Sequence, residues 1–147
     1  MSILPDPDPR IIQEVLRRAG EADAIICALF MKPAPEEPTP RLPEEHLSLL
    51  RRLGGINLPN VCISFYSPTY ITSTPGFRAF LTTYFLSPES MQAAIDVIFG
   101  KAGVSGKLPF TISNSYPAGY GIILKEAETA PQTANSLRMD AFAPGKL

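Results

Sequence analysis

Residues 87–113 read SPESMQAAIDVIFGKAGVSGKLPFTIS, which combines the features of a capped helix, a glycine-rich reversal and a strand. Ser87 and Pro88 predict the start of the helix, and Gly100 predicts its end. Residues 108–113, LPFTIS, are typical of a strand. The apolar residues of the helix recur at the spacing of one buried face: Met91, Ala94, Ile95 and Ile98.

The same kind of alternation precedes this stretch. Two further amphipathic helices are expected over residues 9–20 and 43–55, the first with Ile11, Ile12, Val15, Leu16 and Ala19 on its buried face and the second with Leu47, Leu50 and Leu53. Continuous apolar runs at 22–31, 59–66 and 78–85 read as buried strands. Helices alternating with such strands predict an α/β fold, namely a flavodoxin-like three-layer α/β/α sandwich with a mainly parallel sheet.

The chain divides into three parts. Residues 1–8 are an extended lead-in, because three X-Pro steps keep the backbone out of the helical region. Residues 9–124 form the sandwich domain, interrupted by a proline-rich surface loop at 31–41. Residues 125–147 begin with a run of small and polar residues, KEAETAPQTANS, and we expect a linker or flexible tail there.

Size and charge exclude several classes of protein. The 147 residues fall far short of the ~250 that a (β/α)₈ barrel needs. With 13 basic and 14 acidic residues there is no basic footprint for nucleic acid. The sequence has no apolar run long enough to span a membrane, so no membrane partner is expected. Its N-terminus also lacks the pattern of a signal peptide. The location stays open: a bacterial cytoplasmic protein and an excised domain fit equally well, and as part of a longer secreted precursor the chain would lie in the periplasm.

No residue cluster predicts metal, cofactor or nucleotide chemistry. Glu44, Glu45 and His46 are consecutive on a helix and therefore point in different directions, which favours a solvated helix start. The stretch GKAGVSGK fails as a phosphate-binding loop because Leu108 follows Lys107. Cys27 and Cys62 lie in apolar runs and are expected as buried, reduced thiols. No metal site and no cofactor are expected.

Aromatic residues concentrate between residues 65 and 85. Such rings could stack on sugars, but aromatic residues are also enriched in strands, so core packing is the favoured interpretation. The aromatic residues concerned are Phe65, Tyr66, Tyr70, Phe77, Phe80, Tyr84 and Phe85.

Two segments carry a resemblance to a known family. IDVIFGKAGVSGKLPFTIS, residues 95–113, followed by YPAGYGI, residues 116–122, resembles the C-terminal α/β sandwich domain of glycoside hydrolase family 3. TTYFLSPESMQAA, residues 82–94, is similar to the β-N-acetylhexosaminidase branch of that family. The resemblance extends over roughly residues 10–122, and LRMDAFAPGKL, residues 137–147, resembles a linker into a β-lactamase-like domain of some relatives.

The matching residues are predicted to have structural roles. Gly100 and Gly103 would end the helix and permit the reversal, Gly106 would adopt a positive φ, and Pro109 would mark an edge strand. The complete structural motif is Gly100, Gly103, Gly106, Lys107, Leu108, Pro109, Tyr116, Pro117, Gly119, Tyr120 and Gly121.

The resemblance implies that the catalytic nucleophile and acid/base lie on a barrel domain, and no residue of this chain matches them. We therefore expect no catalytic residue here and an inactive chain. The expected function is a non-catalytic accessory domain of a family 3 glycosidase of the hexosaminidase type, packing on the barrel and shaping its sugar site. Alternatives are a free-standing carbohydrate-binding or protein-interaction module, and an independent flavodoxin-like small-molecule enzyme. An exposed interdomain face could also support a homo-oligomer.

Overall fold

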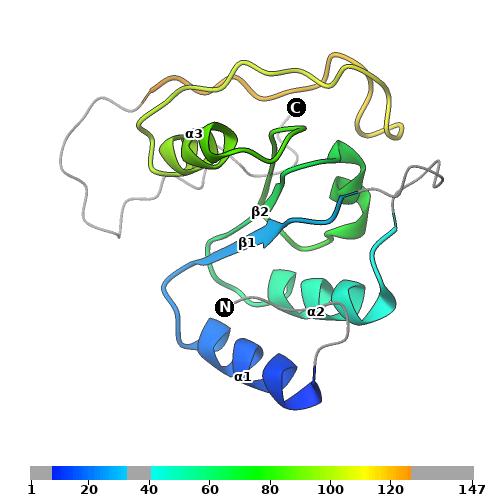
Figure 1. Cartoon of the computed structure of the whole chain (residues 1–147), viewed down its shortest axis with the longest axis vertical. Coiled ribbons are helices and arrows are strands. Elements are labelled where there is room, and N and C mark those ends of the chain that lie inside the picture. The colour runs from blue at the N-terminus through cyan, green and yellow to red at the C-terminus, as the bar shows by residue number, and fades with distance from the viewer. Residues whose placement is uncertain (1–7, 33–40, 127–147) are drawn as a thin grey trace.

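The computed structural model describes residues 8–32 and 41–126 of the chain. The lead-in at 1–7, the centre of the proline-rich loop at 33–40, and the tail at 127–147 lie outside the described residues. The described elements follow the predicted order up to residue 98 (Figure 1). They are helix α1 (Pro9–Gly20), strand β1 (Ile25–Leu29), helix α2 (Glu44–Gly54), strand β2 (Asn60–Ser64), 3₁₀ helix η1 (Pro68–Ser73), strand β3 (Ala79–Thr82) and helix α3 (Pro88–Ile98).

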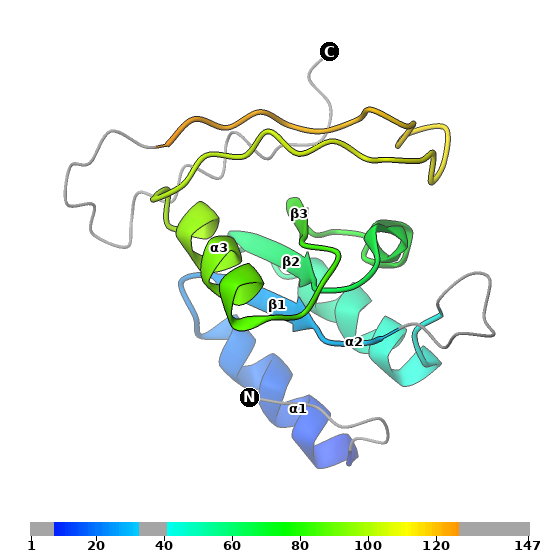
Figure 2. The same cartoon turned by 45° about the horizontal axis from the view of Figure 1, so that its top comes forward.

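The fold is a three-layer α/β sandwich around a small parallel sheet. The strand order is β1-β2-β3, and both neighbouring pairs are parallel. Helices α1 and α2 lie on one side of the sheet and α3 on the other (Figures 1 and 2). The predicted fold class is therefore confirmed.

Two apolar clusters hold α2 and α3 to the sheet. Every residue of β2, the central strand, is buried. On the α2 side the buried cluster contains Leu29, Leu42, Leu50, Cys62 and Tyr70. On the α3 side it contains Val61, Ile63, Phe65, Ala79 and Ala94. Alternate residues of the strands thus serve opposite faces, as the pleat of a sheet requires.

The helix ends are formed as predicted. The Asp8 carboxylate accepts a hydrogen bond from the Arg10 amide at 2.8 Å. Ser87 and Ser90 form a capping box in which each side chain accepts from the other residue's backbone N–H, at 3.2 and 3.0 Å. After α3, Gly100 adopts φ +71°, a left-handed conformation that glycine accepts without steric cost.

Two predicted apolar faces are less buried than the sequence indicated. No residue of α1 is buried, and Ile11 is 40% exposed. On α3, Ala94 is buried but Ile95 is 46% exposed. Helix α1 lies beside α2 (Figure 1). The described sheet has three strands and is too narrow to cover the whole apolar face of each helix.

The predicted fourth strand at 108–113 is not part of the sheet. Residues 104–124 instead fold into a two-limbed arm that runs over α3 and β3 (Figure 2). Val104 and Leu124 form an antiparallel bridge, and the Leu108 amide donates to the Tyr120 carbonyl at 2.8 Å. Pro109 has no N–H to donate, so this segment is paired irregularly with its own return limb. Within the described residues, β3 is consequently an edge strand.

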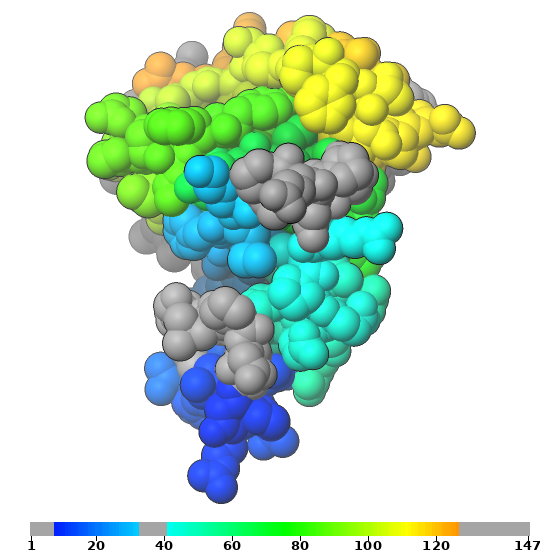
Figure 3. Space-filling view, turned by 45° about the vertical axis from the view of Figure 1, so that its right-hand side comes forward, coloured from blue at the N-terminus to red at the C-terminus, as the bar shows by residue number. Residues whose placement is uncertain are grey.

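The arm and α1 lie at opposite ends of the molecule, with α2 between them (Figure 3). None of the helices in the described parts of the chain is long and apolar enough to cross a membrane.

Asn60 connects the starts of β2 and β3, and its removal should destabilise the fold. Its Oδ1 accepts a hydrogen bond from the Arg78 amide at 2.6 Å, and the residue is 1% exposed. Asn60→Ala leaves this N–H without an acceptor, so we expect a loss of about 1–3 kcal/mol in the free energy of unfolding. Urea denaturation followed by circular dichroism measures it.

Asn57 provides a matched control, because its Oδ1 accepts from the exposed guanidinium of the same Arg78 at 2.9 Å. Asn57→Ala should change the stability by less than about 0.5 kcal/mol. Equal losses in the two variants would contradict the role given to Asn60.

Candidate functional site

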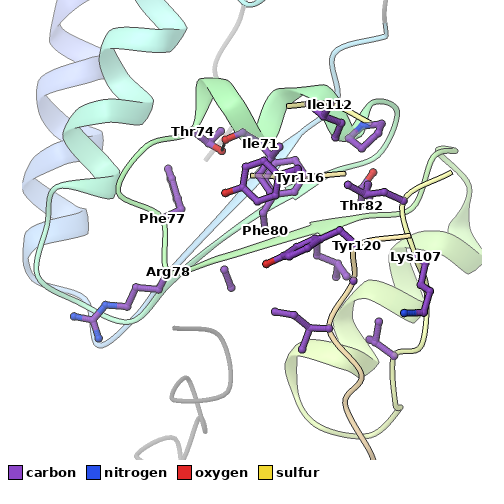
Figure 4. A pocket seen from close by; sticks show the side chains of 18 of the residues that line it. Ile71, Thr74, Phe77, Arg78, Phe80, Thr82, Lys107, Ile112, Tyr116 and Tyr120 are labelled. Atoms are coloured by element: carbon purple, nitrogen blue, oxygen red, sulfur yellow. Dashed lines mark hydrogen bonds between the residues drawn. The ribbon is translucent and has the colours of Figure 1, made fainter. Parts of the chain in front are cut away.

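A groove lies beside the free edge of β3 in the described structure. Its volume is about 390 Å³, within the range of ligand pockets. Residues of η1, β3 and their connections form one wall, and residues of the arm form the other (Figure 4). We call this feature the β3 groove.

Two tyrosines of the YPAGYGI segment form part of the arm wall. Tyr116 and Tyr120 lie 5.5 Å apart between ring centroids, with the rings at 79°. Both rings project into the β3 groove, and Phe80 of β3 approaches them from the other wall (Figure 4). The segment thus brings two rings to the sheet edge, an arrangement that the sequence did not predict.

The aromatic residues between 65 and 85 are distributed between core and groove. Phe65 is 3% exposed and stacks on Phe30 at 5.0 Å, and Tyr70 is 2% exposed. Phe77 and Phe80 contact the α2-side cluster and also line the β3 groove. Packing therefore accounts for most of these rings.

Polar groups in the β3 groove are few. Thr82 Oγ1 is buried and has no hydrogen-bond partner within the described structure. Tyr84, which follows β3, has φ +62°, an uncommon conformation for a residue with a side chain, and partial burial raises the pKa of its hydroxyl. Lys107 Nζ donates to the Gly119 carbonyl at 3.4 Å. The Arg78 side chain is directed away from the tyrosines (Figure 4).

The described residues that line the β3 groove do not include the groups that hydrolyse a glycosidic bond in most glycosidases. That chemistry uses two carboxylic acids on either side of the bond. Among the described residues that line the groove, none is Asp, Glu, His or Cys. Asp96, which precedes the lining residue Val97 in α3, accepts a hydrogen bond from Gln92 at 2.9 Å. The arrangement can bind an apolar or aromatic group but offers no acid/base pair.

The other chemical candidates do not assemble into a site. Glu44 pairs with Arg51 at 2.8 Å, while the Nδ1 atom of the neighbouring His46 is buried and has no hydrogen-bond partner in the described residues. Across residues 8–32 and 41–126, no group of three or more His, Cys, Asp or Glu side chains is placed to hold a metal ion.

The two cysteines are register neighbours on β1 and β2 and are both free. Cys62 is completely buried, as predicted, and Cys27 is partly buried. A hydrogen bond with Cys27, together with burial, raises the pKa of the Cys62 thiol. These positions make Cys62 an unreactive core residue.

The predicted motif residues divide into two sets. Six of them line the β3 groove: Gly106, Lys107, Leu108, Tyr116, Tyr120 and Gly121. The others shape the arm: Gly100 ends α3, Gly119 adopts φ +82°, and a Cβ on Gly103 would lie 2.7 Å from the Leu124 carbonyl oxygen. Pro117 accepts a hydrogen bond from the Tyr120 amide at 3.0 Å.

Two expectations about this motif are wrong. Gly106 does not have a positive φ, and a Cβ added to it would meet no atom within 4 Å. It is Gly121 that needs to be glycine, because its Cβ would collide with the Gly106 carbonyl oxygen. Pro109 lies on the arm and not on an edge strand of the sheet.

Sequence reasoning missed the groove itself, because it assigned residues 108–113 to a strand, whereas in the structure they belong to the arm that forms one wall of the groove. Thr82 and Ile71, which line the groove, stand out in no sequence pattern as binding residues, whereas Tyr84 belongs to the aromatic concentration that could stack on sugars. Pro109 was the available indication that this segment could not pair regularly with β3.

The fold and groove define an α/β sandwich domain with a largely apolar groove at its sheet edge. Comparison with protein families shows that the chain belongs to the glycosyl hydrolase family 3 C-terminal domain family, whose profile matches residues 8–140.

Three similar proteins are glycosidases by name. A probable exo-1,4-beta-xylosidase of Aspergillus clavatus is 31% identical over 108 residues, which are 71% of this chain and 13% of that protein. The corresponding protein of Aspergillus flavus is 26% identical over 142 residues, covering 90% and 17%. An exo-alpha-(1->6)-L-arabinopyranosidase of Bifidobacterium breve is 28% identical over 113 residues, covering 71% and 15%.

The chain thus spans only 13–17% of the length of these relatives. No solved structure matches the chain. The family is confirmed, whereas the hexosaminidase branch is not confirmed, since these three relatives are named for pentosides.

Proposed function

We propose that this chain is a non-catalytic accessory domain of a family 3 glycoside hydrolase, which packs on a separate catalytic barrel and helps to shape its sugar site. The observation that carries the proposal is the family match over residues 8–140, combined with relatives of which this chain spans a small fraction. The catalytic carboxylates then belong to the barrel. The described residues that line the β3 groove include no Asp or Glu, which fits this division of roles.

An uncovered sheet face supports a packing role. Ile26 of β1 is in register with Val61 of β2, so both side chains lie on the α3 face of the sheet. Val61 is buried, but Ile26 is 51% exposed and Phe30, just beyond β1, is 53% exposed. We propose that a partner domain covers this surface, and that the isolated chain can self-associate through it.

Two classes of sugar are candidates for the substrate of the whole enzyme. Residues 82–94 are similar to the N-acetylhexosaminidase branch, whereas the relatives are named for xylose and arabinopyranose. We propose terminal pentopyranosides as the first class to assay, with N-acetylglucosaminides as the second. The overall similarity to named pentosidases, which extends over 71–90% of the chain, supports this order.

The test compares the 147-residue chain with the polypeptide that contains it in its source cell. An antibody raised against the chain is used for blotting and for immunoprecipitation. We expect a polypeptide larger than 16.0 kDa by at least a barrel of ~250 residues, and nitrophenyl-glycoside hydrolysis by the precipitate. The purified chain should hydrolyse none of the β-xyloside, α-L-arabinopyranoside and N-acetyl-β-glucosaminide substrates.

Two results would overturn the proposal. Turnover by the purified chain above the no-protein rate would make it an enzyme in its own right. A native band at 16.0 kDa, with heat detected on titration of xylobiose or chitobiose into the chain, would favour the free-standing carbohydrate-binding module.

A further inference from the structure

The two edges of the sheet differ in what lies beside them. The arm runs beside β3 and forms a wall of the β3 groove (Figure 2). Strand β1 lies at the other end of the order β1-β2-β3 and has no further strand beside it in the described parts of the chain. Proteins often protect an edge strand with a charged residue or a proline. The five residues of β1, IICAL, include neither, so this edge is suited to pairing with another strand.

The backbone groups on this edge follow from the bonds that β1 makes to β2. The Leu29 carbonyl accepts a hydrogen bond from the Phe65 amide at 3.2 Å, so Leu29 faces β2. In a parallel pair, alternate residues direct both backbone groups to the same neighbour, and Ile26 and Ala28 therefore direct theirs outward. No turn or loop of residues 8–32 and 41–126 forms a backbone hydrogen bond with these two residues.

Exposed apolar side chains accompany the outward backbone groups. Ile26 and Phe30 are each about half exposed, and the small side chain of Ala28 between them is exposed as well. The Phe30 ring stacks on Phe65, with 5.0 Å between centroids and 4° between planes. Phe65 belongs to the cluster on the α3 face, so Ile26 and Phe30 lie on that same face. An incoming strand would therefore find both hydrogen-bonding groups and an apolar surface here.

We propose that β1 pairs antiparallel with β1 of a second copy of this chain, around a two-fold axis at Ala28. Residues with outward backbone groups must lie opposite each other, so Ile26 of each copy lies opposite Phe30 of the other. Each exposed phenylalanine ring then packs against an exposed isoleucine, a favourable cross-strand pair. The pairing joins the two three-stranded sheets into one and uses both β1 edges, so association stops at two copies.

The charges beside β1 also suit this arrangement. Asp23 precedes the strand, Lys32 follows it, and both residues are exposed. With the axis at Ala28, Lys32 of one copy lies opposite Ala24 of the other and hence next to its Asp23. Opposite charges therefore meet at each end of the paired strands, whereas parallel pairing in register would bring like charges together.

The expected contact is small, which determines how it must be measured. A five-residue strand with two large apolar side chains should bury less than the about 800 Å² per partner of a standard interface. The dimer should therefore dissociate on dilution. This inference rests on the packing surface proposed above and specifies how a second copy uses it. A monomeric chain would overturn it and leave the accessory role standing, because native size and glycoside turnover test that role separately.

Sedimentation and amide hydrogen exchange of the complete 147-residue chain test the proposal. From micromolar to millimolar concentration, we expect the mass to rise from 16.0 kDa to twice that value and no further. The Ile26 and Ala28 amides should exchange at least tenfold more slowly at the high concentration. The Ile63 amide, which by the same alternation faces β1 of its own chain, should be equally protected throughout and thus reports an intact fold.

Cysteine variants test the register of the pairing. Ala28→Cys places two thiols at the axis, about 5.5 Å apart between Cα atoms, a separation that a disulfide can span. Oxidation should convert this variant to a covalent dimer. Lys32→Cys is the matched control, because it also lies exposed beside β1 but its two copies would be about 27 Å apart. The unaltered chain, in which Cys27 is partly buried and Cys62 buried, gives the background.

Lysine variants test the edge itself. Ile26→Lys places a charge on the paired strand and should abolish the dimer, whereas Ile123→Lys, at an exposed position of the arm, should preserve it. Each of three results would overturn the proposal. They are a mass of 16.0 kDa at every concentration, a dimer in which the Ile26 and Ala28 amides stay unprotected, and equal crosslinking of Ala28→Cys and Lys32→Cys.

Discussion

Leu50→Ala is expected to lower the free energy of unfolding by about 2–5 kcal/mol, the usual cost of truncating a buried leucine. Leu50 is 3% exposed and packs in the cluster with Leu29, Cys62 and Tyr70 that joins α2 to the sheet. A domain has only about 5–15 kcal/mol of stability in total, so this one change removes a large share of it. Urea denaturation followed by circular dichroism at the helix band measures the loss.

Ser48→Ala is the matched control, because Ser48 is exposed on the same helix. It should alter the stability by less than about 0.5 kcal/mol. A loss below about 1 kcal/mol for Leu50→Ala would show that α2 does not anchor the sheet. The contrast between the variants therefore tests the packing and not the helix propensity alone, since alanine is favourable in helices in both cases.

The described helices and strands up to residue 98 were largely predictable because their structure depends on local patterns. Ser87 before an apolar stripe specifies a capped helix wherever that helix packs. The apolar run around Cys62 specifies a strand buried on both faces, and β2 is indeed buried throughout. Strands β1 and β2 are parallel because helix α2 lies between them in the chain and forms the crossover connection.

The remainder depended on distant contacts that a local pattern does not contain. The composition of residues 108–113 is that of a strand, yet their hydrogen bonds go to the return limb that includes Tyr116 and Tyr120. Likewise, the spacing of the apolar residues in α1 predicts a buried helix face but does not identify the element that packs against it. Ile11 is 40% exposed, and no residue of α1 is buried by the other described elements.

The candidate site was even less predictable, because its residues come from segments on both sides of α3. The sequence gives Tyr120 and Gly121 as part of a motif, but their position opposite β3 results from the reversal after Gly100. Thr82 becomes notable only when its hydroxyl is buried without a partner. The family match then supplies what geometry alone does not, which is the kind of enzyme to which such a domain belongs.

Gly121→Ala is expected to separate the limbs of the arm and to remove one wall of the β3 groove. The added Cβ would collide with the carbonyl oxygen of Gly106 and lie 3.2 Å from Lys107 Cα, so backbone and not a flexible side chain must move. The expected cost is about 1–3 kcal/mol, as for other overpacked sites. Because the arm is held by few backbone bonds, we expect it to open locally while the sheet stays folded.

The measurement is hydrogen exchange of the Leu108 amide, which donates to the Tyr120 carbonyl, and of the Val104 amide, which donates to Leu124. Both should exchange at least tenfold faster in Gly121→Ala, with the Ile63 amide unchanged. Gly106→Ala is the control on the facing limb, since its Cβ would meet no atom within 4 Å and its φ is not positive. Because alanine also restricts the unfolded chain, this variant should be neutral or slightly more stable. Unchanged exchange in Gly121→Ala would mean that the two limbs are not held as closely as the structure places them, and the β3 groove would then lack its outer wall in solution.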